Sequence, residues 1–193
     1  NLADGSEARD QALRFVRRAL ESHGFDGLAA AGLGNYVASS IAMGLAANGS
    51  TSDPGDAGTL GDAVSFLRNN QWDETEGVST RQDWFGGAGY GNRGRPDLSN
   101  TQMMLDALYD AGVSPDEPVV QKALVFLSRT QNLKATNPAA WAQAGSDDGG
   151  FVYTPANDGE SFGSAAAGEG RYGETMPAGV ARSLRSYGSM TYA

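Results

Sequence analysis

The feature that most constrains the fold of this chain is a six-residue pattern that recurs three times. The pattern reads polar, Ala, aliphatic, variable, Phe, aliphatic, and it occupies residues 11–16, 62–67 and 122–127. The copies begin 51 and 60 residues apart, and the second and third are followed at the same offset by Gln71 and Gln131. Apolar residues around the first copy fall on one helical stripe, namely Ala8, Ala12, Phe15, Val16 and Ala19. The pattern therefore predicts an amphipathic helix that is repeated three times.

A second kind of helix is predicted to alternate with the first. Residues 35–48 are rich in Ala and are followed by Gly49, and residues 98–111 are followed by Gly112. A glycine directly after a helix is expected because the left-handed conformation costs it nothing. These segments carry small or apolar side chains on more than one face, which is typical of buried helices. A shift of 63 residues superimposes the two segments.

Glycine accounts for 27 of the 193 residues and is dense in one long stretch, at about residues 132–174. We interpret this stretch as a Gly-rich insertion that is functional, mobile or both, because long structureless connections are unusual within a compact domain. Residues 189–192 then repeat the Ser-variable-Thr-polar form of residues 99–102. We therefore expect residues 1–193 to form a single helical domain, or part of one in a longer protein.

Three sequence segments resemble a known repeat family. They are Trp-Phe-Gly-Gly-Ala-Gly-Tyr-Gly at 84–91, Arg-Pro-Asp-Leu-Ser-Asn-Thr-Gln at 95–102, and Phe-Leu at 126–127 followed by Gln131 and Asp-Gly-Gly-Phe at 148–151. Together they resemble the prenyltransferase and squalene-cyclase (terpenoid cyclase) repeat family, and residues 188–193 resemble the start of a further repeat in its bacterial members. The resemblance implies an all-α fold, an α/α toroid-like array of helical hairpins joined by long Gly-rich loops.

The catalytic residue sets of that family are missing from this chain. It contains no Cys and a single His, His23, so zinc-dependent prenyl transfer is not supported. It also has no Asp-x-Asp-Asp, the motif that the family's cyclases use to protonate an alkene. We expect no metal and no cofactor, and a non-catalytic module that acts as a binding scaffold. Two alternatives stay open. The first is a terpenoid-cyclase-like or prenyltransferase-like enzyme with an apolar cavity for an isoprenoid and with its acid motif on a missing segment. The second is a carbohydrate-active toroid that uses Asp147 or Asp148 as acid or base.

Candidate ligand-binding residues lie between positions 84 and 109, a range that includes two of the segments that carry the resemblance. Aromatic faces can line a cavity and stabilise cations, and two arginines in a Gly-rich loop before a helix can hold a phosphate. The candidates are Trp84, Phe85, Tyr90, Arg93, Arg95, Thr101, Gln102 and Tyr109. The competing interpretation is structural: the loop is a tight turn in which Asp97 caps the following helix and pairs with an arginine, and the aromatic side chains fasten neighbouring repeats.

The charge and hydropathy of the chain restrict its partners. A formal net charge of −9 repels phosphate backbones, so a nucleic-acid partner is not expected. No apolar run approaches the roughly 20 residues of a membrane span, so no transmembrane segment is expected. The remaining partners are a lipid or isoprenoid ligand or another protein. The absence of Cys is compatible with every redox compartment, an extracytoplasmic one included.

Overall fold

The computed structural model describes residues 5–47, 49, 54–91, 94–155 and 186 of the chain. These residues form helices and irregular loops, with two isolated β-bridges, so the predicted all-α class is confirmed. Six α-helices occur among them, together with a π-helical turn, η2, and a 3-10 turn, η4. Their bounds in chain order are α1 Gly5–Leu28, η2 Ala29–Leu33, α2 Gly34–Ala47, α3 Pro54–Asn69, η4 Glu74–Glu76, α4 Leu98–Asp110, α5 Pro118–Thr130 and α6 Ala140–Ala144.

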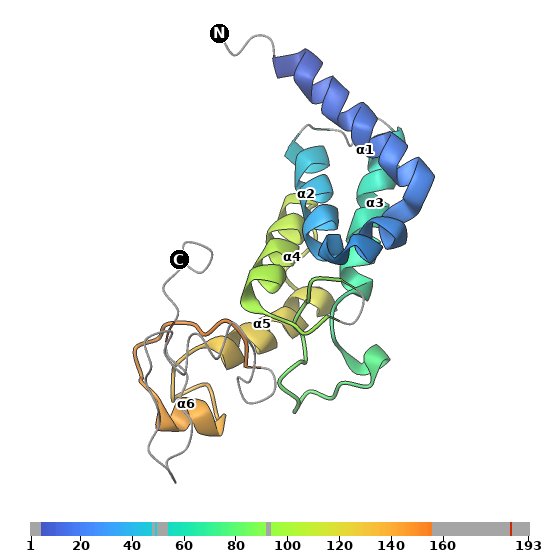
Figure 1. Ribbon diagram of the computed structural model, residues 1–193. Helices are drawn as coiled ribbons and strands as arrows, with labels where there is room; N and C mark the ends of the chain where they lie inside the picture. The colour runs from blue at the N-terminus through green and yellow to red at the C-terminus, as the bar shows by residue number, and fades with distance from the viewer. Residues whose placement is uncertain (1–4, 48, 50–53, 92–93, 156–185, 187–193) are drawn as a thin grey trace.

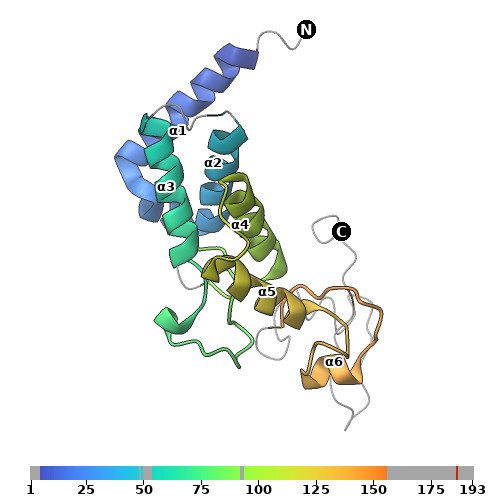
Figure 2. The same ribbon diagram turned by 180° about the vertical axis from the view of Figure 1, so that it is seen from behind.

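Helices α2 and α4 lie side by side and run in the same direction (Figures 1 and 2). Their first turns are joined by hydrogen bonds, from Asn35 Nδ2 to the carbonyl of Asn100 at 2.8 Å and between Tyr36 Oη and Ser99 Oγ at 2.5 Å. Tyr36 and Ser99 are 63 residues apart, which is the shift that superimposes the two helices in the sequence. Helix α3 packs against α2 and α4, and α5 packs against α4.

The predicted helix ends agree with the structure to within a residue at most. Helix α2 was expected over residues 35–48 and α4 over 98–111. Gly49 and Gly112, which follow them, have φ of 65° and 77°, the left-handed conformation that glycine adopts without strain. Pro118 occupies the first turn of α5, where its missing N–H costs little.

The core lies where α2, α3 and α4 meet. Ala38 and Ala42 on α2 are fully buried, and their small side chains allow α4 to approach closely. Met104, Ala107 and Leu108 of α4 are also fully buried. None of the helices in the described ranges is both long and apolar enough to cross a membrane.

The repeats are visible as a recurring loop closure after helices α3 and α5. After α3, Gln71 pairs with Ala88 in an antiparallel bridge, and after α5, Gln131 pairs with Phe151 in the same way. Each bridge follows a Gly-Gly pair whose first member has a positive φ, 85° at Gly86 and 74° at Gly149. The repeat that the sequence predicts therefore extends from the helices into the loops.

The first copy of the helical pattern departs from the other two. Phe66 and Phe126 are 8% and 0% exposed, whereas Phe15 at the same repeat position is 70% exposed. The apolar stripe predicted on α1 is therefore largely uncovered among the described residues. Only residues 132–155 of the predicted Gly-rich insertion are described, and they hold α6 and the second loop closure. The helix start expected at residues 189–192 lies outside the described residues.

Candidate functional site: a tyrosine cluster at the start of the parallel helices

Three tyrosines from distant parts of the chain meet near the first turns of α2 and α4. The rings of Tyr36 and Tyr90 lie 5.7 Å apart, and the hydroxyls of Tyr90 and Tyr153 are 2.9 Å apart. The Tyr36 hydroxyl also bonds Ser99. Tyr90 is 38% exposed, so the tyrosine cluster, defined as Tyr36, Tyr90 and Tyr153, reaches the surface.

Backbone hydrogen bonds hold the cluster in place. The amide of Asn35 donates to the carbonyl of Tyr90 at 3.3 Å, which fixes the Gly-rich loop on the start of α2. The amide of Leu98 donates to the carbonyl of Tyr153 at 2.8 Å, and Thr154 Oγ1 donates to the carbonyl of Pro96 at 2.8 Å. Segments 153–154 and 96–98 are therefore tied together just before α4 begins.

A buried carboxylate and an arginine lie beside the tyrosines. Asp97 is fully buried and caps α4, because its carboxylate accepts from the amide of Asn100 at 2.8 Å and from Asn100 Nδ2 at 2.9 Å. Burial raises the pKa of Asp97, although the Asn100 hydrogen bonds and the charge of Arg95 act in the opposite direction. The Arg95 guanidinium lies 5.6 Å from the Tyr153 ring centre. The structural interpretation of this loop, in which Asp97 caps the helix, is thus the observed one.

The protonation of Tyr36 favours hydrogen bonding over acid–base chemistry. Burial raises the pKa of Tyr36 above its usual value, so its hydroxyl stays protonated at neutral pH. The Nε atom of Arg95 is buried and has no hydrogen-bond partner within the part of the chain that the structure describes. The cluster therefore offers aromatic rings, phenolic hydroxyls and one guanidinium for recognition.

The surface next to Tyr90 is hollowed. A pocket of about 410 Å³ lies between the π-helical turn η2 and the Gly-rich loop. Among its described lining residues, Asp26 alone is charged. The lining is Asp26, Ala29, Ala30, Gly32, Tyr90, Gly91 and Gly94. Because most of these side chains are small, a partner can approach the backbone closely here.

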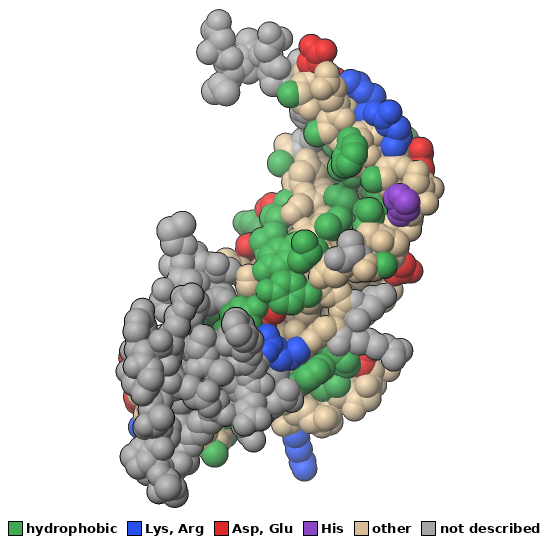
Figure 3. Space-filling model, in the orientation of Figure 1, with side chains coloured by type: hydrophobic (Ala, Val, Ile, Leu, Met, Phe, Trp, Pro, Cys, Tyr) green, Lys and Arg blue, Asp and Glu red, His purple; other side chains and the backbone are tan. Residues whose placement is uncertain are grey.

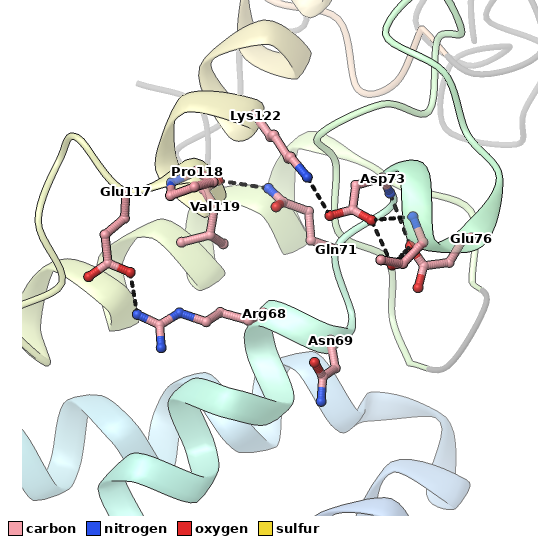
Figure 4. A pocket seen from close by; sticks show the side chains of 10 residues that line it. Arg68, Asn69, Gln71, Asp73, Glu76, Glu117, Pro118, Val119 and Lys122 are labelled. Atoms are coloured by element: carbon pink, nitrogen blue, oxygen red, sulfur yellow. Dashed lines mark hydrogen bonds and ion pairs between the residues drawn. The ribbon is translucent and has the colours of Figure 1, made fainter.

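A second pocket, of about 460 Å³, lies between the end of α3 and the start of α5 (Figure 4). Its cations are paired within the protein: Arg68 with Glu117, and Lys122 with Asp73 and Glu74, both at 2.7 Å. Burial acts to raise the pKa of Asp73, but hydrogen bonds from Lys122 and Thr75 outweigh it and lower the pKa to about 2. We interpret this pocket as a charged joint between repeats, because its charges already satisfy one another.

Most of the residues proposed from the sequence have structural partners. Trp84 packs edge-on against Trp72 with ring centres 4.7 Å apart, and Phe85 is 3% exposed with the Lys122 ammonium 5.9 Å from its ring centre. Thr101 is fully buried, where its Oγ1 accepts from the amide of Ala88 and donates to the carbonyl of Asp97. These aromatic and hydroxyl side chains fasten loops to helices.

The other candidates divide between two ends of α4. Tyr90 and Arg95 both contact Tyr153, near the start of the helix. Gln102 is half-buried on the helix, and Tyr109, 80% exposed, lies at its far end. Arg93 lies outside the described residues. The sequence analysis missed Tyr36, although the shift of 63 residues that aligns it with Ser99 was a usable signal.

The alternative carboxylates act in turns. Asp147 Oδ1 accepts from the amide of Lys134 at 2.8 Å, and Asp148 Oδ1 accepts from the amide of Gly150 at 2.9 Å and from Ser186 Oγ at 2.5 Å. The hydrogen bond from Ser186 contributes most to the lowered pKa of Asp148. Across the described ranges, His, Asp and Glu side chains form no group that could hold a metal ion.

Comparison of the chain with protein-family models, with curated protein sequences and with solved structures found no match.

Proposed function

We propose that this chain is a non-catalytic helical-repeat module that binds a protein partner through the tyrosine cluster. In this proposal its hairpins belong to a toroid-like array of the prenyltransferase and squalene-cyclase type. The observation that carries the proposal is the tyrosine cluster itself: three tyrosines and Arg95 gathered at the starts of two rigid, parallel helices.

Tyrosine and arginine suit protein recognition for a physical reason. Tyr buries a large apolar ring while losing little conformational entropy, and its hydroxyl still forms hydrogen bonds. Tyr and Arg are accordingly enriched among the residues that contribute most to binding energy. Here Tyr36 and Tyr90 are held by contacts within the protein before any partner arrives, which reduces the entropic cost of binding.

The enzyme alternative is favoured by one observation, the raised pKa of buried Asp97. An alkene-protonating acid needs a carboxyl group that stays protonated in an apolar cavity. Asp97 instead accepts hydrogen bonds at both carboxylate oxygens from Asn100, so its geometry suits a helix cap. We therefore place the binding role first.

The experiment compares two tyrosine variants in partner capture and binding. Immobilised wild-type protein, Tyr90→Ala and the control Tyr109→Ala are incubated with an extract of the source cells, and the proteins retained are quantified. A partner retained by the wild type is then purified and its Kd is measured for each form. We expect Tyr90→Ala to weaken binding at least tenfold and Tyr109→Ala to leave it unchanged, because Tyr109 lies at the opposite end of α4. Equal binding by the two variants would refute the proposed site.

A parallel assay addresses catalysis. The wild type and Asp97→Asn are incubated with squalene and with a polyprenyl diphosphate, and products are sought by mass spectrometry. Asn is also a good helix cap, so Asp97→Asn should fold. The proposal expects no product from either form. Product formed by the wild type and lost in folded Asp97→Asn would replace the binding role with the enzyme alternative.

A further inference from the structure

Helix α1 exposes two arginines and a phenylalanine on one side. Phe15 is 70% exposed, and Arg14 and Arg18, which lie one turn apart, are exposed beside it. Arg18 Nε donates to the backbone carbonyl of Arg14 at 3.2 Å, and neither guanidinium forms an ion pair within the described ranges. Figure 3 shows basic side chains in a row along this helix. We call Arg14, Phe15 and Arg18 the basic face.

The end of α4 exposes the opposite combination, two aspartates and a tyrosine. Tyr109 is 80% exposed, and Asp106 and Asp110, again one turn apart, are exposed beside it. Neither carboxylate forms an ion pair in the part of the chain that the structure describes. Partial burial of Asp106 and the negative charge of Asp110 both raise the pKa of Asp106, so the two carboxylates repel each other. We call Asp106, Tyr109 and Asp110 the acidic face.

Each face is suited to a surface that carries the opposite charge. Side chains four residues apart are neighbours on a helix, so each face holds two like charges side by side, which destabilises the helix slightly. A partner with the opposite pair of charges removes this repulsion and also covers an aromatic ring. Phe15 and Tyr109 are the two most exposed large hydrophobic side chains among the described residues. Each face therefore has the charge and the apolar surface that complement the other.

One molecule does not bring its own two faces together. Helix α2 packs against both α1 and α4 and lies between them (Figure 1). The basic face and the acidic face are thus exposed on helices that α2 separates. A contact between the two faces therefore joins two copies of the chain.

The order of the residues decides the direction of such a contact. Phe15 follows the first arginine of its face by one residue, whereas Tyr109 precedes the second aspartate by one residue. Because successive residues of an α-helix are rotated by about 100°, the two aromatic rings lie on opposite sides of their charged pairs. Two helices packed in parallel present opposite sides to each other, so the charges meet and the two rings meet. In an antiparallel pair, each ring would instead face the charges of the other helix.

We propose that α1 of one copy of this chain packs in parallel against α4 of a second copy, with the basic face on the acidic face. The first and second arginines pair with the first and second aspartates, and Phe15 packs against Tyr109. The contact is head-to-tail, so it builds a ring or a chain of copies. The tyrosine cluster takes no part in it, so this contact and the proposed partner binding can fail independently. Partner binding by Tyr109→Ala is accordingly compared at concentrations too low for copies to associate.

Sedimentation velocity at low ionic strength, over protein concentrations from about 1 to 200 μM, tests the proposal. We expect the wild type to associate as its concentration increases. Arg14→Glu combined with Arg18→Glu places like charges across the contact, and it should weaken the association at least tenfold. Asp106→Lys combined with Asp110→Lys should have the same effect for the same reason. Far-UV circular dichroism verifies that the variants are folded.

The decisive variant carries all four substitutions. It exchanges the charges of the two faces and leaves the net charge of the chain unchanged, so its copies should associate as the wild type does. The matched control combines Arg81→Glu with Lys134→Glu, at exposed positions outside both faces. This control changes the net charge as much as the arginine variant does, and it should keep most of the wild-type association because the contact itself is intact.

Three results would overturn the proposal. The first is a wild type that stays monomeric at the highest concentration. The second is association of either folded double variant at the wild-type level, or a control that loses as much association as the arginine variant. The third is a folded four-substitution variant that stays monomeric while the wild type associates, because the exchanged charges would then not face each other.

Discussion

Replacing Gln71 tests whether the glutamines of the repeat hold neighbouring repeats together. Gln71 is 2% exposed, and its Nε2 donates to the carbonyl of Gly86 at 2.9 Å and to that of Val119 at 2.8 Å. One amide group therefore links the end of α3 to the loop at Gly86 and to the start of α5. Methionine has nearly the same length and volume but no hydrogen-bond donor, so Gln71→Met removes these bonds with little change in packing.

The expected cost follows from the bonds lost. Each hydrogen bond contributes about 1 kcal/mol net, and a buried carbonyl left unpaired costs about 1–3 kcal/mol. Val119 lies in the first turn of α5, where its carbonyl can still accept a helical bond, so Gly86 bears most of the penalty. Gln71→Met should lower the free energy of unfolding by about 2–3 kcal/mol.

Gln131 provides a matched control at the same repeat position. It is half-buried, and its Nε2 donates to the carbonyl of Gly149 at 2.8 Å. With one side-chain hydrogen bond among the described residues, and in a wetter site, Gln131→Met should lower the free energy of unfolding by about 0.5–1.5 kcal/mol. The difference between the variants therefore measures the additional contact of Gln71 with α5.

Urea unfolding followed by far-UV circular dichroism measures both effects. With a slope of ~2 kcal/mol/M, Gln71→Met should shift the midpoint down by about 1–1.5 M, and Gln131→Met by less than about 0.8 M. The slopes must stay equal for the comparison to hold. Equal shifts in the two variants, or a loss below about 0.5 kcal/mol for Gln71→Met, would show that the reasoning about inter-repeat hydrogen bonds is wrong.

Two further predictions concern the glycine at position 87 and the ion pair between Asp73 and Lys122. Gly87→Ala should lower the free energy of unfolding by about 1–3 kcal/mol, because its Cβ would lie 2.6 Å from Pro96. Gly44→Ala, on α2 with open space around the new Cβ, should raise the free energy of unfolding by about 0.5–1 kcal/mol. Thermal melts in which Gly87→Ala is more stable than Gly44→Ala would contradict this prediction. The Asp73 carboxylate has a pKa lowered to about 2, so its ion pair with Lys122 stabilises the fold above pH 4 and is lost as the pH falls from 4 to 2. After allowing for solvent screening, Lys122→Met should therefore have a free energy of unfolding about 1–2 kcal/mol below that of the wild type at pH 6. This difference should nearly vanish near pH 2. A difference that does not change with pH would exclude the Asp73–Lys122 pair as its source.

The sequence alone determined helices α1 to α5 and their repeat, but not α6, which lies within the predicted Gly-rich insertion. The period of the apolar residues fixed which stretches are helical, and glycines at positions 49 and 112 fixed where two helices end, because these signals act within a few residues of the chain. The repeat also showed that α2 and α4 are equivalent segments 63 residues apart, although their parallel packing, with Tyr36 bonded to Ser99, was not predicted. The structural interpretation of Asp97 as a helix cap had the same local basis.

Only the tertiary structure decided which copies of the pattern are covered and where the tyrosines meet. Phe15 and Phe126 share one sequence pattern, yet one is exposed and the other buried, because burial depends on what the neighbouring repeat places against the helix. Tyr36, Tyr90 and Tyr153 come from three distant segments, and their contact depends on the register between helices and loops. Periodicity describes a helix face, but the partner of that face is set by packing between elements far apart in the chain.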